Sequence, residues 1–199
     1  MQLILKNIDL NTSFIRPGKN SFIYFDEVES TLDIALKSEI QKNSIGKVVI
    51  TDNQKKGRGS YNKLWFSEPY KDLTFSIILG NKLKFSENFV ENTCDTIVEI
   101  LNEYNIIGRK KLPNDVFVGD KKIAGILLSK IFKNNHVYKQ ALSIGININS
   151  NFDIREKGKH YTFSNTSFIK ELKKETEREK VLEKILLKID KIIQKQANL

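Results

Sequence analysis

The chain has 199 residues, 40% of them apolar, and a formal net charge of +9 from 33 basic and 24 acidic residues. This length and composition are typical of one folded domain with its own core. No apolar run is long enough to cross a membrane, and the N-terminal stretch lacks the long apolar centre of a signal peptide. Cys94 is the single cysteine, which excludes an internal disulfide, and two scattered His cannot complete a zinc site. We therefore expect a cytoplasmic protein.

The positive charge leaves more than one class of partner open. It could attract nucleic acid, or an acidic protein surface. The commoner origin of such an excess is a Lys-rich surface, and much of it lies in the last thirty residues, where Lys and Glu interleave as on a solvated helix. We expect no DNA binding. A non-catalytic basic binding module remains the alternative of another class, and the sequence leaves a homodimer open.

The first half of the chain predicts strands and helices in alternation. Ser30, followed three residues later by Asp33, has the form of a capping box and predicts a helix with apolar positions up to Ile40. Helical periodicity predicts a long amphipathic helix over 86–104. Apolar and β-branched runs predict three strands, over 21–28, 46–51 and 73–80.

The second half predicts mostly strands. Residues 108–132 have the pattern strand, Pro-Asn-Asp corner, strand, Gly-Asp hairpin, strand, and a further strand follows over 136–148. Residues 149–166 have a loop-like composition. A second capping box, Thr176 with Glu179, predicts a closing amphipathic helix over 176–196. Consecutive strands favour antiparallel pairing, so we predict an α+β (α/β-type) domain with a mixed β-sheet flanked by helices.

Two turn segments contain residues suited to binding anions. Gly57, Arg58 and Gly59 combine backbone N–H groups that can approach an anion closely with a forked donor for phosphate or carboxylate. In "KLPND", Pro113 fixes a turn between Lys111 and Asp115, which could bind phosphate and a metal ion. Alone, each segment is more often a surface loop or a locally capped turn.

Two strand segments add further candidates. Lys122 starts "KKIAGILLS", where the small residues Ala124 and Gly125 could allow close approach of a ligand, although a bulge or tight packing explains them equally well. In "SIGININ", Asn147 is a polar residue at the end of an apolar strand, a position that also suits an ordinary turn.

In their order and spacing, these segments resemble the catalytic domain of biotin protein ligases. The matching segments cover about residues 20–170 and are Ser30-Thr31, the loop from Gln54 to Trp65, "KLPND", "KKIAGIL" and "SIGININ". The resemblance implies a class II synthetase-like fold. It also implies ATP-dependent activation of biotin as biotinyl-5′-AMP and transfer to a lysine of a biotin carboxyl carrier protein of a biotin-dependent carboxylase.

The domain organisation implied by this resemblance is a single catalytic domain over 1–199. We expect neither a helix-turn-helix before residue 20 nor a full C-terminal SH3-like domain, because the chain closes with the amphipathic helix over 176–196. Lipoate or octanoate ligases and transferases share the fold and are the nearest alternative. The Gly-Arg-Gly loop that ends in Trp65 and the "KIAGIL" segment fit biotin better.

The resemblance further implies roles for individual residues. The catalytic set would be Lys122, Arg58, Lys111 and Asp115. The biotin-binding set would be Ser30, Thr31, Gln54, Gly57, Arg58, Gly59, Lys122, Gly125 and Leu127. The ATP-binding set would be Trp65, Lys111, Asn114, Asp115 and Asn147, with Asp115 also a ligand of Mg²⁺.

The sequence departs from the family pattern at several positions. Ser60 stands where the family often has a second Arg, and Ser143 where it has Gly. The other departures are Leu32, Asn62, Lys63 and Leu112. We expect Ser60 to make the loop a weaker clamp on the adenylate.

Overall fold

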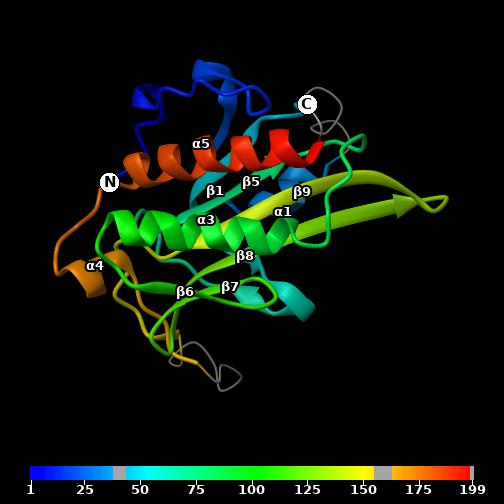
Figure 1. The fold of residues 1–199 in the computed structure, drawn as a ribbon. Coiled ribbons are helices and arrows are strands. Elements are labelled where there is room, and N and C mark those ends of the chain that lie inside the picture. The colour runs from blue at the N-terminus through cyan, green and yellow to red at the C-terminus, as the bar shows by residue number, and fades with distance from the viewer. Residues whose placement is uncertain (38–43, 155–162, 198–199) are drawn as a thin grey trace.

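The computed structural model describes residues 1–37, 44–154 and 163–197. Within these residues the chain forms a seven-stranded mixed sheet in the order β1-β2-β5-β9-β8-β7-β6 (Figure 1). Its strands are β1 (Phe22–Val28), β2 (Val48–Gln54), β5 (Leu73–Ile78), β6 (Gly108–Lys111), β7 (Asp115–Val118), β8 (Lys121–Lys133) and β9 (His136–Ile146). Strands β1 and β2 are parallel and the remaining pairs are antiparallel, which confirms the predicted mixed sheet.

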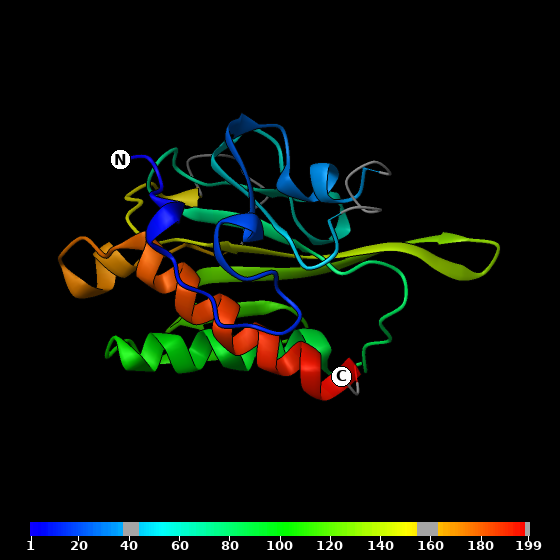
Figure 2. The ribbon, with the colours of Figure 1, turned by 90° about the horizontal axis from the view of Figure 1, so that it is seen from above.

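Helices cover both faces of this sheet. Helices α3 (Phe89–Glu103) and α5 (Arg178–Ala197) lie side by side on one face, as Figures 1 and 2 show, and the pair Lys188–Glu99 joins them at 2.9 Å. The short helix α1 (Thr31–Ala35) lies on the opposite face. Because side chains alternate along a strand, Val48 and Ile50 join the core under α3 and α5, whereas Val49 packs with α1.

The N-terminal segment also belongs to the core. Leu3, Ile8, Leu10 and Ile15 are buried, around the short 3-10 turns η1 (Leu5–Asn7) and η2 (Gly18–Ser21). The Asp190 carboxylate on α5 accepts hydrogen bonds of 2.7–3.0 Å from three consecutive backbone N–H groups, those of Ser13, Phe14 and Ile15. The core therefore begins well before residue 20, where the family resemblance starts.

Several element boundaries differ from the prediction. The Ser30 cap is confirmed, since its Oγ accepts from the Asp33 N–H at 3.4 Å, but α1 ends at Ala35; the predicted positions 38–40 lie outside the described residues. Helix α5 begins at Arg178 rather than at Thr176, whose N–H and C=O both bond to the side chain of Asn149. A short helix α4 (Phe168–Leu172), capped by the Ser167 hydroxyl, was not predicted.

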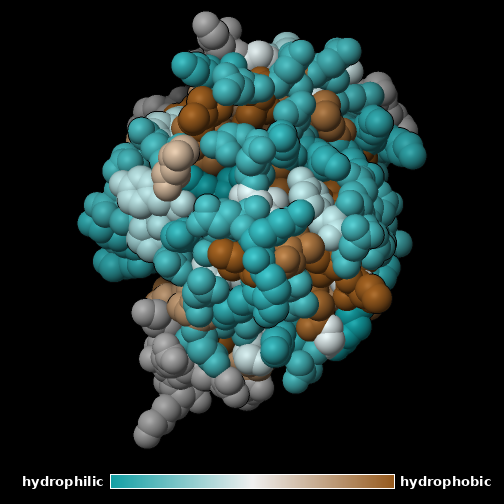
Figure 3. Space-filling model, turned by 90° about the vertical axis from the view of Figure 1, so that its left-hand side faces the viewer, coloured by the Kyte–Doolittle hydropathy of each residue, from teal (hydrophilic) through white to brown (hydrophobic). Residues whose placement is uncertain are grey.

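The β8–β9 hairpin extends beyond the rest of the sheet (Figures 1 and 2). Strand β5 pairs with β9 only over residues 141–146, and β7 pairs with β8 only over 121–125. The face shown in Figure 3 is largely hydrophilic, with apolar side chains in small separate groups. None of the helices among the described residues is long and apolar enough to span a membrane.

Candidate functional site

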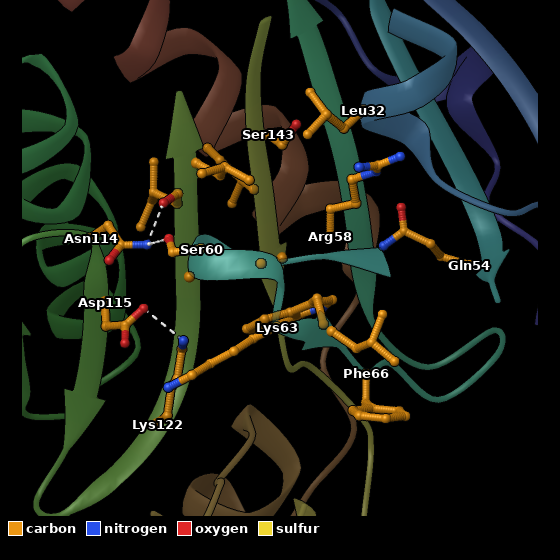
Figure 4. Close-up of a pocket in the computed structure, with 18 of the residues that line it drawn as sticks. Leu32, Gln54, Arg58, Ser60, Lys63, Phe66, Asn114, Asp115, Lys122 and Ser143 are labelled. Carbon is orange, nitrogen blue, oxygen red and sulfur yellow. Dashed lines mark hydrogen bonds and ion pairs between the residues drawn. The ribbon is translucent and has the colours of Figure 1, made fainter. Parts of the chain in front are cut away.

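A cavity of about 230 Å³ lies on the face of the sheet that carries α1 (Figure 4). Its floor includes Gly125 and Leu127 on β8 and Ser143 and Gly145 on β9, positions that alternate along paired strands and so share one face. The loop of residues 57–66 covers it, and the start of α1 closes one side.

The covering loop is folded into a small hairpin. Strand β3 (Gly57–Arg58) pairs with β4 (Leu64–Trp65), and a 3-10 turn, η3 (Ser60–Asn62), joins them. A Cβ on Gly57 would lie 2.4 Å from Gln54 Nε2 and 2.5 Å from the Trp65 carbonyl oxygen. Only glycine allows this approach, so Gly57 determines the shape of the loop. Gly57 itself does not line the cavity.

Two polar contacts hold the loop from opposite sides. Arg58 Nε lies 2.8 Å from the Asp33 carboxylate on α1. On the other side, Asn114 Nδ2 donates to Ser60 Oγ at 2.9 Å and to the Ile126 carbonyl at 2.8 Å (Figure 4). Ser60, where the resemblance implied a second Arg, therefore has a partner in the "KLPND" turn, in which the Leu112–Pro113 bond is cis.

Trp65 lies on a platform made by two glycines. Gly125 and Gly145 are direct cross-strand partners, and neither places a side chain beneath the indole. A Cβ on Gly145 would lie 2.2 Å from Trp65 Cε2, and one on Gly125 would lie 3.1 Å from Trp65 Cζ3. Close approach of the ring thus explains the glycine in each of the two strands.

Lys122 and Asp115 form an ion pair at the cavity wall (Figure 4). Lys122 Nζ lies 2.6 Å from Asp115 Oδ1, with 15% of the Lys122 side chain and 23% of the Asp115 side chain exposed. The β7–β8 pairing is irregular here: Phe117 pairs with Lys122 and Val116 with Ala124, so β8 contains a bulge at Ile123. Bulges commonly re-aim a side chain next to a functional site.

A series of hydrogen bonds connects residues along the cavity lining. Thr31 donates to Gln54 Oε1 from its N–H at 2.8 Å and from its hydroxyl at 3.1 Å. The Ser76 hydroxyl donates to Thr31 Oγ1 at 3.0 Å and lies 2.7 Å from Ser143 Oγ. These hydrogen bonds link α1, β2, β5 and β9, and every residue in the series except Ser76 lines the cavity.

Apart from Asp115 Oδ1, which has its ion pair with Lys122, three buried polar atoms of cavity-lining residues have no hydrogen-bond partner among the described residues. They are Trp65 Nε1, Asn147 Oδ1 and Asn165 Nδ2. Buried polar atoms are nearly always paired in folded proteins, so a group of unpaired ones around one cavity is typical of a ligand site.

Twelve of the fourteen predicted site residues line this one cavity: Ser30, Thr31, Gln54, Arg58, Gly59, Trp65, Asn114, Asp115, Lys122, Gly125, Leu127 and Asn147. Gly57 and Lys111 do not. Lys111 is exposed, and its ammonium lies 4.6 Å from the Phe117 ring centroid. Asp115, predicted to act with Lys111, has its ion pair with Lys122 instead.

The prediction missed several lining residues. Gly145 lay inside a quoted motif without being singled out, and Ser143 was noted only as a departure. Phe163 and Asn165 come from a segment predicted as featureless loop, where Asn165 forms a bridge to Lys122 and the Phe163 ring lies 5.3 Å from Lys122 Nζ. No motif in that segment pointed to them.

Sequence relatives match part of this chain. The bifunctional ligase/repressor BirA of Bacillus spizizenii is 27% identical over 161 residues, which are 76% of this chain and 50% of the relative. BirA of Bacillus subtilis is 27% identical over 157 residues, 74% of this chain and 48% of the relative. The chain thus spans about half the length of these relatives.

Solved structures match a larger part of this chain than the sequence relatives do. The biotin protein ligase of Aquifex aeolicus in complex with biotin and ATP superimposes with a TM-score of 0.72 and 27% identity, covering 89% of this chain and 72% of that chain. The Leishmania major biotin protein ligase in complex with biotinyl-5-AMP shares the fold, with a TM-score of 0.66 at 19% identity, covering 89% of this chain and 76% of that chain. The model of the biotin/lipoate A/B protein ligase family matches residues 23–149. Since this match covers more than half of the chain, the protein belongs to the biotin/lipoate A/B protein ligase family.

Proposed function

We propose that this protein activates biotin with ATP as biotinyl-5′-AMP and transfers the biotinyl group to a lysine of a biotin carboxyl carrier protein. The observation that carries the proposal is the convergence of five separate segments on one cavity. The Aquifex aeolicus structure, which is similar over 89% of this chain, holds biotin and ATP, and the two Bacillus relatives are ligases as well as repressors.

The first half-reaction needs cations around the reacting groups. A carboxylate oxygen of biotin attacks the α-phosphorus of ATP, and the bond to pyrophosphate breaks. Both reactants are anions, so the site must cancel their repulsion and hold them in line. Lys122 and Arg58 line the cavity and can supply that charge, as can the backbone N–H groups of the covering loop. Lys111 could act only on ATP groups that extend beyond the cavity.

The second half-reaction needs a neutral amine. The carrier lysine attacks the acyl carbon of the mixed anhydride, AMP leaves, and the amine loses a proton. Asp115, at the cavity wall beside Lys122, is the candidate to orient the amine or accept that proton. A mixed anhydride hydrolyses in water, so a loop that covers the cavity protects it.

Mg²⁺ is part of the proposal. Among the residues that the structure describes, no three His, Cys, Asp or Glu side chains lie close enough together to hold a metal ion. Proteins commonly bind Mg²⁺ through one or two carboxylates together with substrate phosphates. Asp115 offers one carboxylate at the cavity wall, which fits an ion that enters with ATP and offsets the charge of its phosphates.

The test is ATP-dependent transfer of labelled biotin to a purified carrier domain, with lipoate and octanoate as competing acids. We expect labelling with biotin and none with the other two. Labelling with lipoate or octanoate instead would favour the related ligases. Salt-dependent binding to nucleic acid without ATP-dependent transfer would favour the non-catalytic module.

A further inference from the structure

The series of hydrogen bonds from Gln54 to Ser143 at the cavity has a fixed direction. The Thr31 backbone N–H can only donate, and it lies 2.8 Å from the Gln54 side chain, so the atom it meets is the carbonyl oxygen Oε1. That oxygen cannot donate. The end of the series at Gln54 is therefore an acceptor.

The number of hydroxyl protons determines which atom donates in each of the remaining hydrogen bonds. Three contacts follow one another: Thr31 Oγ1 to Gln54 Oε1, Ser76 Oγ to Thr31 Oγ1, and Ser76 Oγ to Ser143 Oγ. Each needs one proton, and the three hydroxyls carry one each. Since Thr31 donates to Gln54, Ser76 must donate to Thr31, and only Ser143 is left to donate to Ser76.

Toward the cavity, Ser143 Oγ therefore offers only lone pairs and can act only as a hydrogen-bond acceptor. Ser143 is half-buried, while its neighbours Leu142 and Ile144 are buried, and it lines the cavity in Figure 4. Its only hydroxyl proton is committed to Ser76, which has no exposed surface. A ligand group that meets Ser143 Oγ must donate a hydrogen bond, because an acceptor there would meet lone pairs without a proton between them.

We propose that Ser143 determines ligand specificity, its Oγ accepting a hydrogen bond from a ring N–H of the acid that this enzyme activates. This inference rests on the proposed function. The ureido ring of biotin has two N–H groups, whereas the dithiolane ring of lipoate and the alkyl chain of octanoate have none. Ser143 thus favours biotin at a position where the family's Gly offers no side chain.

The experiment couples a change in the protein to a change in the ligand. Dissociation constants are measured calorimetrically for biotin and for two carbamate analogues, each with one ring N–H replaced by oxygen. In wild type, one analogue should bind on the order of a hundredfold more weakly than biotin, since a donor becomes an acceptor opposite Ser143. In Ser143→Ala, biotin should weaken by about tenfold, whereas that analogue should bind about tenfold more tightly, because the lone pairs that oppose its ring oxygen are gone. A double-mutant cycle isolates this coupling.

A second variant tests the direction of the proton. Ser76→Ala removes the acceptor of the Ser143 proton but keeps the Ser143 hydroxyl, which can then donate to the ring oxygen. The penalised analogue should regain about tenfold in affinity. Ser129→Ala, a serine on β8 that does not line the cavity, is the matched control and should change none of these values.

The outcomes separate this inference from the proposed function. Equal loss of affinity for all three ligands in Ser143→Ala would mean a structural role and would overturn the inference alone. No recovery in Ser76→Ala would overturn the assigned direction. Absence of biotin binding by wild type would overturn the proposed function and this inference together.

Discussion

Gly145→Ala should displace the only tryptophan of the chain. The added Cβ would lie 2.2 Å from Trp65 Cε2, 2.5 Å from Nε1 and 2.7 Å from Cδ2, whereas ordinary contact begins at 3.4 Å. Gly145 lies in a strand without a positive φ, so its backbone accepts alanine and the ring must move instead. A displacement of about 1 Å at a positioned group costs roughly a hundredfold in rate.

The measured quantities are kcat/KM for biotin transfer, Trp65 fluorescence and thermal stability. We expect about a hundredfold lower kcat/KM. The emission should shift to longer wavelength as the indole leaves its platform. Stability should fall by only about 1 kcal/mol, at the low end of the cost of overpacking, because the ring can move toward the cavity.

Gly125→Ala is the graded comparison for this prediction. Its Cβ would lie 3.1 Å from Trp65 Cζ3, so the ring needs to move by only a few tenths of an ångström. The emission shift should therefore be clearly smaller than in Gly145→Ala. If Gly145→Ala keeps the wild-type emission and activity within about twofold, the glycine platform does not position Trp65.

Three further predictions concern other parts of the site. Lys122→Ala should abolish biotin-dependent pyrophosphate exchange, because the positive charge of Lys122 reduces the repulsion between the two reacting anions. Unchanged exchange would remove Lys122 from the mechanism. Ser60→Arg should slow the release of free biotinyl-AMP, because it adds a cation that can hold the adenylate. Ser60→Ala should speed the release, because it removes the hydroxyl that accepts from Asn114 and adds nothing in its place. Equal release from both variants and the wild type would contradict this. Burial raises the pKa of Asp72 from 3.8 to about 6, so the native state binds the proton more tightly than the unfolded chain does. Stability should fall by up to about 3 kcal/mol as pH rises from about 4 to about 6, and urea unfolding of Asp72→Asn should lack this slope.

Periodicity predicted the sheet well but not the covering loop. Strand β5 is buried at every position, as its continuous apolar run predicted. Residues 57–66 have no hydrophobic period, and their pairing depends on how Gly57 fits against Gln54 and how Trp65 meets Gly145. Those are tertiary contacts between distant segments, which local pattern does not contain. The same holds for the N-terminal segment, where the backbone of residues 13–15 is anchored by Asp190 near the far end of the chain.

Within the site, sequence proximity did not show which cation lies beside Asp115. Lys111 and Asp115 flank a turn fixed by Pro113, which suggested that they act together, and in the structure they are cross-strand partners. The bulge in β8 brings Lys122 to Asp115 instead, while the ammonium of Lys111 lies over Phe117. Ser143 was noted only as a missing glycine, because its meaning depends on Ser76, sixty-seven positions earlier.

The contacts of the covering loop explain why its mutations should differ in effect. The Arg58–Asp33 pair is 59% and 42% exposed at its two side chains, and exposed pairs of this kind contribute between about 0 and 1 kcal/mol. The partly buried Asn114–Ser60 hydrogen bond contributes about 1 kcal/mol. Both contacts are weak, and the contact of Trp65 with the glycine platform adds to them. Gly145→Ala should therefore move the whole loop, whereas changes at Ser60 should alter only the release of the adenylate.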